Sequence, residues 1–153
     1  MKVLVALDDS PVSARAARSA ARLFGSQPDT EFLVINVAAV PTPWAAGVGY
    51  GWVGPMMVDP RWFQPDPPDE DDLERALLDE AAGAGLPDAR PIVRAGDAVE
   101  QICAAADANH VDVIVVGSHD KSALARLFDP SVASGVVRGT HLPVVVVSGT
   151  PPA

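Results

Sequence analysis

The stretch 111–148 constrains the fold most, because it predicts a strand, a polar loop, a helix and a second strand in succession. Val113–Val116 is apolar and mostly β-branched and runs into Gly-Ser, as expected of a buried parallel strand that enters a loop. Apolar residues recur at helical spacing in Ser131–Thr140, and Leu142–Val147 is typical of another buried strand. The polar loop therefore follows the carboxyl end of a strand, where ligands bind in open α/β sheets.

The same alternation of strand and helix runs through the rest of the chain. Strands are predicted at Lys2–Leu7, Glu31–Val37 and Ala89–Arg94, and helices at Pro11–Phe24, from 69–72 to Gly83 or Gly85, and at Ala98–Asn109. The order βαβαβαβαβ predicts a doubly wound α/β fold, with five parallel strands, helices on both faces and right-handed crossovers. We expect one domain over residues 1–148 and a loose tail over 149–153.

Each predicted helix has one apolar face that we expect to be buried. The inward residues are predicted to be Val12, Ala16, Ala20, Leu23 and Phe24 in the first helix, Leu73, Ala76, Leu77 and Ala81 in the second, and Val99, Ile102, Cys103 and Ala106 in the third. Ser10 or Asp9 is the expected N-cap of the first helix, with Pro11 at its first position.

The charge of the chain excludes several partners. A net charge of −9 argues against nucleic acid and anionic membrane surfaces, both of which need a basic face. The single Cys103 cannot form an internal disulfide and is expected to be a small core residue. The chain begins directly with a predicted strand and has no apolar run of membrane-spanning length, so the cytoplasm is the expected compartment.

Motifs of the common enzyme classes are absent from the sequence. It contains neither the Gly-x-Ser-x-Gly elbow of hydrolases nor the lysine motif of P-loop proteins. His119 and Asp120 with Asp8 and Asp9 are too loosely spaced for a dedicated metal site, and no further His or Cys joins them. We therefore expect no catalytic residues and no resident metal.

The segment 41–68 interrupts the pattern abruptly. It holds seven prolines and four glycines in 28 residues, together with five of the eight aromatic side chains of the chain. Such proline density excludes regular structure, whereas the aromatic content argues against plain disorder. Two interpretations stay open: the aromatics pack over the edge of the sheet, or the segment forms a lid or a partner-binding surface.

Through four short motifs in this order, the sequence resembles the universal stress protein family over nearly its whole length. They are Asp8-x-Ser10-Pro11 after the first strand, Gly96-Asp97 before the third helix, Val115-Val116-Gly117-Ser118, and Pro143 before the last valine run. The resemblance implies a Rossmann-like sheet of strand order 3-2-1-4-5. In that order Asp8 and Gly117 flank the topological switch point, where doubly wound sheets bind ligands.

Many members of this family bind ATP through Gly-x-x-Gly, nine further residues, then Gly and Ser or Thr. Glycines let the backbone approach phosphate oxygens, and successive N–H groups with a helix N-terminus supply a positive field. Gly117 matches the first position, Ser118 follows as usual, and Ser131 matches the last. Asp120 and Pro130 replace the second and third glycines, which adds a negative charge and removes an N–H donor from the phosphate cradle.

The rest of the implied nucleotide site is less altered. Asp8 matches the position near adenine or ribose, and Val37 lies where the backbone of the second strand meets the base; a plain helix N-cap is the alternative role for Asp8. Lys121 adds positive charge to the loop, and Asp120 with phosphate oxygens would suit Mg²⁺. The expected ligand contacts are Asp8, Val37, Gly117, Ser118, Lys121 and Ser131, with ATP, and Mg²⁺ if ATP binds, as the candidate cofactor.

The resemblance implies a regulatory or protective module of the stress response, with a degenerate ATP-binding loop and no turnover chemistry. An ATP- or AMP-binding switch that tolerates Asp120 and Pro130 is the alternative, and a protein-interaction module using 41–68 is a second one. Family members commonly dimerise through the last strand, here 143–148. As an outer strand rich in valine it would otherwise expose a flat edge, so we expect a homodimer with an isologous interface.

Overall fold

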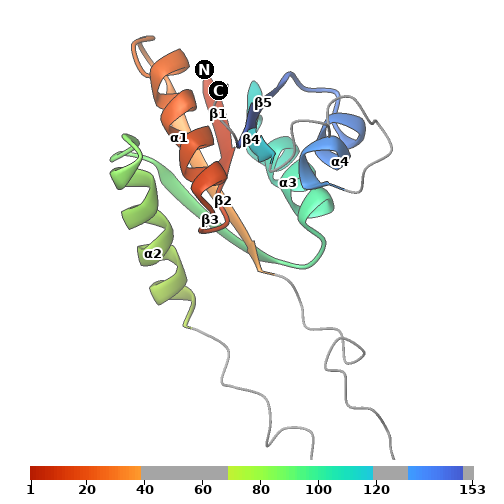
Figure 1. Cartoon of the computed structure of the whole chain (residues 1–153), viewed down its shortest axis with the longest axis horizontal. Coiled ribbons are helices and arrows are strands. Elements are labelled where there is room, and N and C mark those ends of the chain that lie inside the picture. Colours follow the sequence, from red (N-terminus) through yellow and green to blue (C-terminus); the bar gives the residue numbers. More distant parts are fainter. Residues whose placement is uncertain (39–68, 119–130, 150–153) are drawn as a thin grey trace, which may run out of the picture.

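The computed structural model describes residues 1–38, 69–118 and 131–149. In chain order the elements are β1 (Lys2–Ala6), α1 (Pro11–Phe24), β2 (Glu31–Ala38), α2 (Glu70–Gly83), β3 (Arg90–Ala95), α3 (Ala98–Ala108), β4 (Val113–Ser118), α4 (Val132–Gly139) and β5 (Val144–Ser148) (Figure 1). The predicted alternation of strand and helix is confirmed within these residues. The Trp-rich segment 41–68 lies outside them, and its role stays a prediction.

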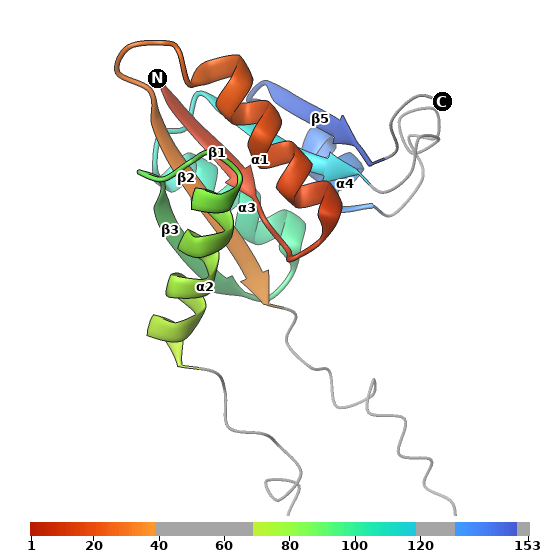
Figure 2. The same cartoon turned by 60° about the vertical axis from the view of Figure 1, so that its left-hand side comes forward.

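The strands form one parallel sheet in the order β3-β2-β1-β4-β5, which confirms the expected topology. β1 lies at the centre, where Leu4 pairs in register with Leu33 of β2 and with Ile114 of β4. α1 and α2 cover one face of the sheet, and α3 and α4 cover the other (Figures 1 and 2). The reversal of strand order places the carboxyl ends of β1 and β4 side by side.

Alternate residues of each strand enter two separate hydrophobic cores, because successive side chains point to opposite faces of a sheet. Val3, Val5, Val34 and Val115 pack under α1 and α2. The other face packs Leu4, Leu33, Ile35, Ile114 and Val116 against α3 and α4. The central strands are therefore buried on both faces, which explains why their sequences are continuous apolar runs.

The helices begin at polar residues that accept backbone N–H groups of the first turn. The N-caps are Ser10, Asp69, Asp97 and Ser131, whose side chains accept from Ser13, Asp71, Glu100 and Ser134. α3 and α4 pack closely on the second face through glycine: a Cβ on Gly135 would lie 2.5 Å from Cγ2 of Val99. That contact sets how closely α4 approaches α3.

Several predicted boundaries and faces differ from the structure. β5 starts at Val144 and includes Ser148, whereas the sequence predicts a strand over Leu142–Val147. The register with β4 begins at Val144, directly after Pro143, whose carbonyl accepts the N–H of Ile114 but which has no N–H of its own to donate. Leu23 is 54% exposed and Ala76 is exposed, since the buried faces of α1 and α2 centre on Ala16–Ala20 and on Leu77 with Ala81. Cys103 is half-buried rather than in the core, and its burial raises the pKa of its thiol.

Candidate functional site

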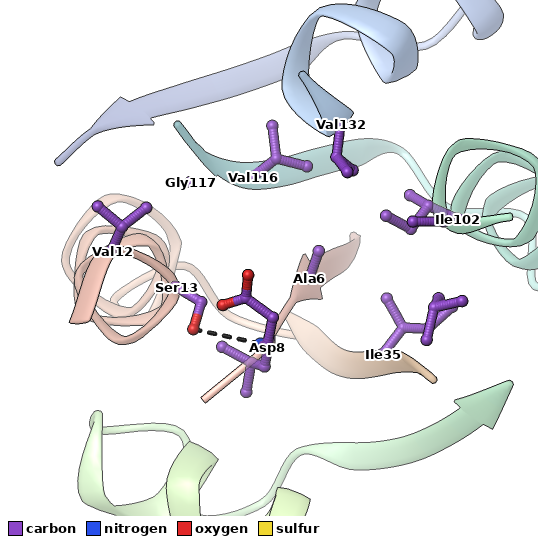
Figure 3. A pocket seen from close by; sticks show the side chains of 12 residues that line it. Ala6, Asp8, Val12, Ser13, Ile35, Ile102, Val116, Gly117 and Val132 are labelled. Carbon is purple, nitrogen blue, oxygen red and sulfur yellow. Dashed lines mark hydrogen bonds between the residues drawn. The ribbon is translucent and has the colours of Figure 1, made fainter. Parts of the chain in front are cut away.

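A cleft opens at the carboxyl ends of β1 and β4, at the switch point of the sheet (Figure 3). Its volume is about 240 Å³. Twelve residues from both faces line it: Ala6, Leu7, Asp8, Val12, Ser13, Ile35, Val37, Ala98, Ile102, Val116, Gly117 and Val132. The cleft is therefore bounded by the first turns of α1, α3 and α4 and by the ends of the central strands.

The described wall of the cleft is apolar except at the turn between β1 and α1, where its polar groups lie. Asp8 is the only charged residue among those that line it, and Ser13 is the only other one with a polar side chain. The Asp8 carboxylate points into the space that the lining residues surround (Figure 3). An apolar slot with a single carboxylate suits a flat, weakly polar group that carries hydroxyls or N–H donors at one side.

Asp8 is held in place by the turn between β1 and α1. Its backbone N–H donates to Oγ of Ser13 at 3.3 Å, and its Oδ1 accepts the backbone N–H of Ser10 at 3.1 Å and the Ser10 hydroxyl. Ser10, and not Asp8 or Asp9, is the N-cap of α1. Asp8 thus supports the cap residue from two positions earlier in the chain, while its carboxylate faces the cleft.

The packing of α1 on β4 requires a glycine at position 117. A Cβ at Gly117 would lie 2.3 Å from Cγ1 of Val12 and 3.0 Å from the Val12 carbonyl oxygen. Only a residue without a side chain lets the first turn of α1 approach β4 this closely. The glycine therefore brings α1 to the edge of the cleft.

Of the other predicted ligand contacts, Val37 lines the cleft, whereas Ser118 and Ser131 do not. Val37 lines the cleft with Gly117 and Asp8, so the structure brings these three together. Ser118 is 3% exposed and lies outside the lining, and its carbonyl oxygen accepts the N–H of Gly149 at 2.8 Å. The Ser131 hydroxyl caps α4 by accepting the N–H of Ser134 at 3.2 Å. Lys121, with Asp120 and Pro130, lies outside the described residues, and binding by all six predicted contacts stays a prediction.

Sequence reasoning missed most of the apolar wall and one acidic neighbour. Ala98 and Ile102 line the cleft from one face of α3, a helical spacing that is detectable in the sequence but equally typical of core packing. Glu80 of α2 lies beside the β1–α1 turn, with Oε1 3.3 Å from Oγ of Ser13. Burial and the neighbouring Asp9 raise the pKa of Glu80. No local pattern in the sequence points to Glu80, which is 67 residues from Ser13.

In the described part of the chain, no group of three or more His, Cys, Asp or Glu side chains is arranged to hold a metal ion. No helix there has the length and apolar character needed to cross a membrane.

The fold and the cleft define a Rossmann-like α/β protein with an apolar cleft at the switch point of its sheet, the place where proteins of this topology bind ligands. The sequence matches the universal stress protein family over residues 1–148. The chain belongs to this family, which confirms the resemblance found in the sequence. No curated protein matches the chain.

Solved structures with the same fold are similar over almost the whole chain. A universal stress protein in complex with cAMP is 19% identical, with 96% of each chain covered and a TM-score of 0.62. A universal stress protein family protein from Arabidopsis thaliana with AMP bound is 18% identical, covering 98% of this chain and 92% of that one at 0.62. A member from Burkholderia pseudomallei is 23% identical, covering 95% and 94% at 0.59.

Proposed function

We propose that this universal stress protein is a regulatory module that binds an adenine nucleotide in the cleft at the carboxyl ends of β1 and β4. In this proposal it catalyses no reaction on the nucleotide. The observation that carries the proposal is the apolar cleft at the switch point with the Asp8 carboxylate aimed into it. Two proteins of the same fold are bound to cAMP and to AMP. At 19% and 18% identity these structures show a shared fold alone, so the ligand proposed for this chain is argued from its own cleft.

The described residues fit the adenosine part of such a ligand. Small-molecule sites in proteins have volumes of roughly 300–1,000 Å³. A cleft of about 240 Å³ therefore suits a nucleoside-sized group better than a whole triphosphate. Val37, Ile35 and Ile102 offer apolar surface to a base, and the Asp8 carboxylate can accept hydrogen bonds from ribose hydroxyls. The phosphate cradle predicted from the sequence falls largely on residues 119–130, outside the described part.

The described cleft also supports the absence of turnover chemistry in this proposal. Ser13 is the only hydroxyl in the lining and is 3% exposed. Its oxygen accepts the Asp8 N–H, and its proton is within reach of the Ser10 carbonyl oxygen at 3.0 Å. A nucleophile needs an accessible oxygen and an adjacent base aligned with the substrate. Ser13 instead serves the turn that carries Asp8.

The proposal includes a homodimer formed through β5. Among the described strands, β5 lies at one edge of the sheet and pairs with β4 alone. All five of its residues are half-buried, and its valines alternate between the two cores. An ordered edge strand with an apolar surface tends to pair with another strand.

We propose that the protein works in the cytoplasm. Its free, half-buried Cys103 suits a reducing compartment.

Calorimetric titration of ligand-stripped protein with AMP, cAMP and ATP tests the nucleotide site. We expect micromolar binding of AMP or cAMP, and about tenfold weaker binding in Asp8→Asn, because a charged acceptor of hydroxyl hydrogen bonds is lost. Asp29→Asn is the matched control, since Asp29 is an exposed acid in a turn at the opposite end of the sheet. Absence of heat at millimolar nucleotide, with an unshifted melting temperature, would reject the nucleotide site and favour an interaction module instead.

A further inference from the structure

A chain of polar contacts connects α2 to the cleft. Glu80 Oε1 lies 3.3 Å from Oγ of Ser13, and this Oγ accepts the backbone N–H of Asp8 at 3.3 Å. Asp8 in turn presents its carboxylate to the cleft. A change in the charge of Glu80 can therefore affect the backbone of Asp8 through a single side chain, that of Ser13.

Ser13, the residue that connects Glu80 to Asp8, is buried. It is 3% exposed, and its hydroxyl proton has two acceptors within reach, the Ser10 carbonyl oxygen at 3.0 Å and Glu80 Oε1. Its backbone N–H donates to the Ser10 hydroxyl at 3.1 Å, which ties it to the cap of α1. A buried hydroxyl must keep its partners, because a polar group left unsatisfied in the interior is costly. The Glu80 carboxyl thus influences how the β1–α1 turn is held.

Among the described residues, no cation offsets the charge of Glu80. α2 packs on α1, β2 and β3. The residues of β2 and β3 on that face are Phe32, Val34, Asn36, Pro91 and Val93, and the neighbours of Glu80 one turn away on α2 are Ala76, Leu77, Gly83 and Ala84. The charged groups that act on Glu80 are Asp9 and, more weakly, Asp8, both from the β1–α1 turn, while α1 contributes the Ser13 hydroxyl.

These surroundings favour the neutral form of the Glu80 carboxyl. Desolvation by burial is the largest cause of its raised pKa, the negative charge of Asp9 is the second, and the Ser13 hydrogen bond opposes them. A protonated Glu80 can donate its proton to a neighbouring carboxylate, and hydrogen bonding to Asp9 is a smaller cause of the raised pKa. The backbone of Asp9 adopts the left-handed region, at a φ of 59°.

We propose that Glu80 is a positioning residue for Asp8 and that its protonation state sets the affinity of the cleft for its ligand. This inference rests on the proposed function, because Asp8 is the charged residue offered to the nucleotide. With Glu80 protonated, one negative charge beside Asp9 and Asp8 is removed, and the repulsion between α2 and the β1–α1 turn is relieved. Once Glu80 is ionised, it repels Asp9 and Asp8, and the turn that carries Asp8 loosens.

Adenosine is the suitable probe, because it carries no phosphate that titrates in the same range. We expect its affinity for the wild-type protein to increase several-fold as the pH falls from neutral towards the ordinary pKa of a glutamate. Glu80→Gln should keep the high affinity throughout and flatten the profile. Asp79→Asn is the matched control: it removes an exposed carboxylate from the neighbouring position of α2 and should follow the wild type. Equal pH dependence in wild type and Glu80→Gln would overturn the proposal.

A readout without ligand separates this proposal from the proposed function. The backbone amide resonances of Asp8 and Ser13 are followed by ¹⁵N NMR while ligand-free protein is titrated with acid. We expect both to move with a midpoint above the ordinary pKa of a glutamate in the wild type, and to lose that step in Glu80→Gln. If adenosine does not bind but this step is present, the nucleotide site fails and the positioning by Glu80 stands. If adenosine binds and the Asp8 amide ignores Glu80→Gln, the positioning is refuted.

Discussion

Gly117 of β4 lies directly against Val12 of α1, with no room for a side chain between them. A Cβ on Gly117 would meet the Val12 Cγ1 at 2.3 Å and its carbonyl oxygen at 3.0 Å. The backbone oxygen cannot move without shifting the first turn of α1, which begins directly after the turn that carries Asp8. The same glycine that opens the ATP motif of the family thus sets the width of the cleft.

Replacement of Gly117 by alanine should therefore destabilise the protein. We expect a loss of about 1–3 kcal/mol in the free energy of unfolding, as for other overpacked sites, measured by urea denaturation. Val12→Ala should relieve part of this loss in the double variant, because it removes the closest atom. Gly83→Ala is the control: a Cβ there meets nothing within 4 Å, so that variant should be neutral or more stable by up to about 1 kcal/mol. A Gly117→Ala protein as stable as the wild type would contradict the packing argument.

Glu80 should make the stability of the ligand-free protein depend on pH. Its pKa is raised in the folded state by burial and by Asp9, so the folded protein binds a proton more tightly than the unfolded chain does. The stabilising contribution is complete below the unfolded pKa and is lost as the pH rises through the folded pKa. Chemical denaturation across this window should show Glu80→Gln gaining stability over the wild type at neutral pH and losing that advantage in acid. An advantage that is constant with pH would point to packing rather than to titration.

The fold was predictable from the sequence because its signals are local. Val3–Leu7, Phe32–Ile35 and Val113–Val116 are apolar runs of strand length, and Gly25 and the capping residues Ser10 and Asp97 mark helix ends. The doubly wound topology follows from the alternation, given that crossovers are right-handed. The faces were predicted less well at Leu23 and Ala76, where the docking angle of a whole helix decides burial.

The site was predictable only where the chain itself places residues at strand ends. Asp8, Val37 and Gly117 follow or end β1, β2 and β4, so topology alone brings them together. Ser13 and Glu80 could not be found in that way, because their contact depends on how closely α2 packs beside α1. The pKa of Glu80 likewise depends on burial, which has no signature in the sequence.

The edge of β5 provides a test of the proposed homodimer. Val145→Lys or Val146→Lys places a charge in the valine strand, where pairing with a second copy would bury it at a prohibitive cost. We expect light scattering to report half the mass of the wild type for either variant. Val137→Lys, on the exposed side of α4 at 42% exposure, is the control and should leave the mass unchanged. A dimer mass for both strand variants would place the interface elsewhere.

Asp120 is the residue through which the sequence most clearly departs from the ATP-binding pattern of the family. A carboxylate about 4 Å from a phosphate oxygen costs roughly 1–4 kcal/mol, depending on the effective dielectric constant. In Mg²⁺-free buffer we therefore expect Asp120→Gly to raise ATP affinity by about tenfold or more, while adenosine affinity stays constant. Asp107→Asn, an exposed acid on α3, controls for the change in net charge. With Mg²⁺ present the gain should shrink, because a carboxylate and phosphate oxygens together coordinate the metal. Equal ATP affinities of wild type and Asp120→Gly in both buffers would mean that this acid does not approach the phosphates.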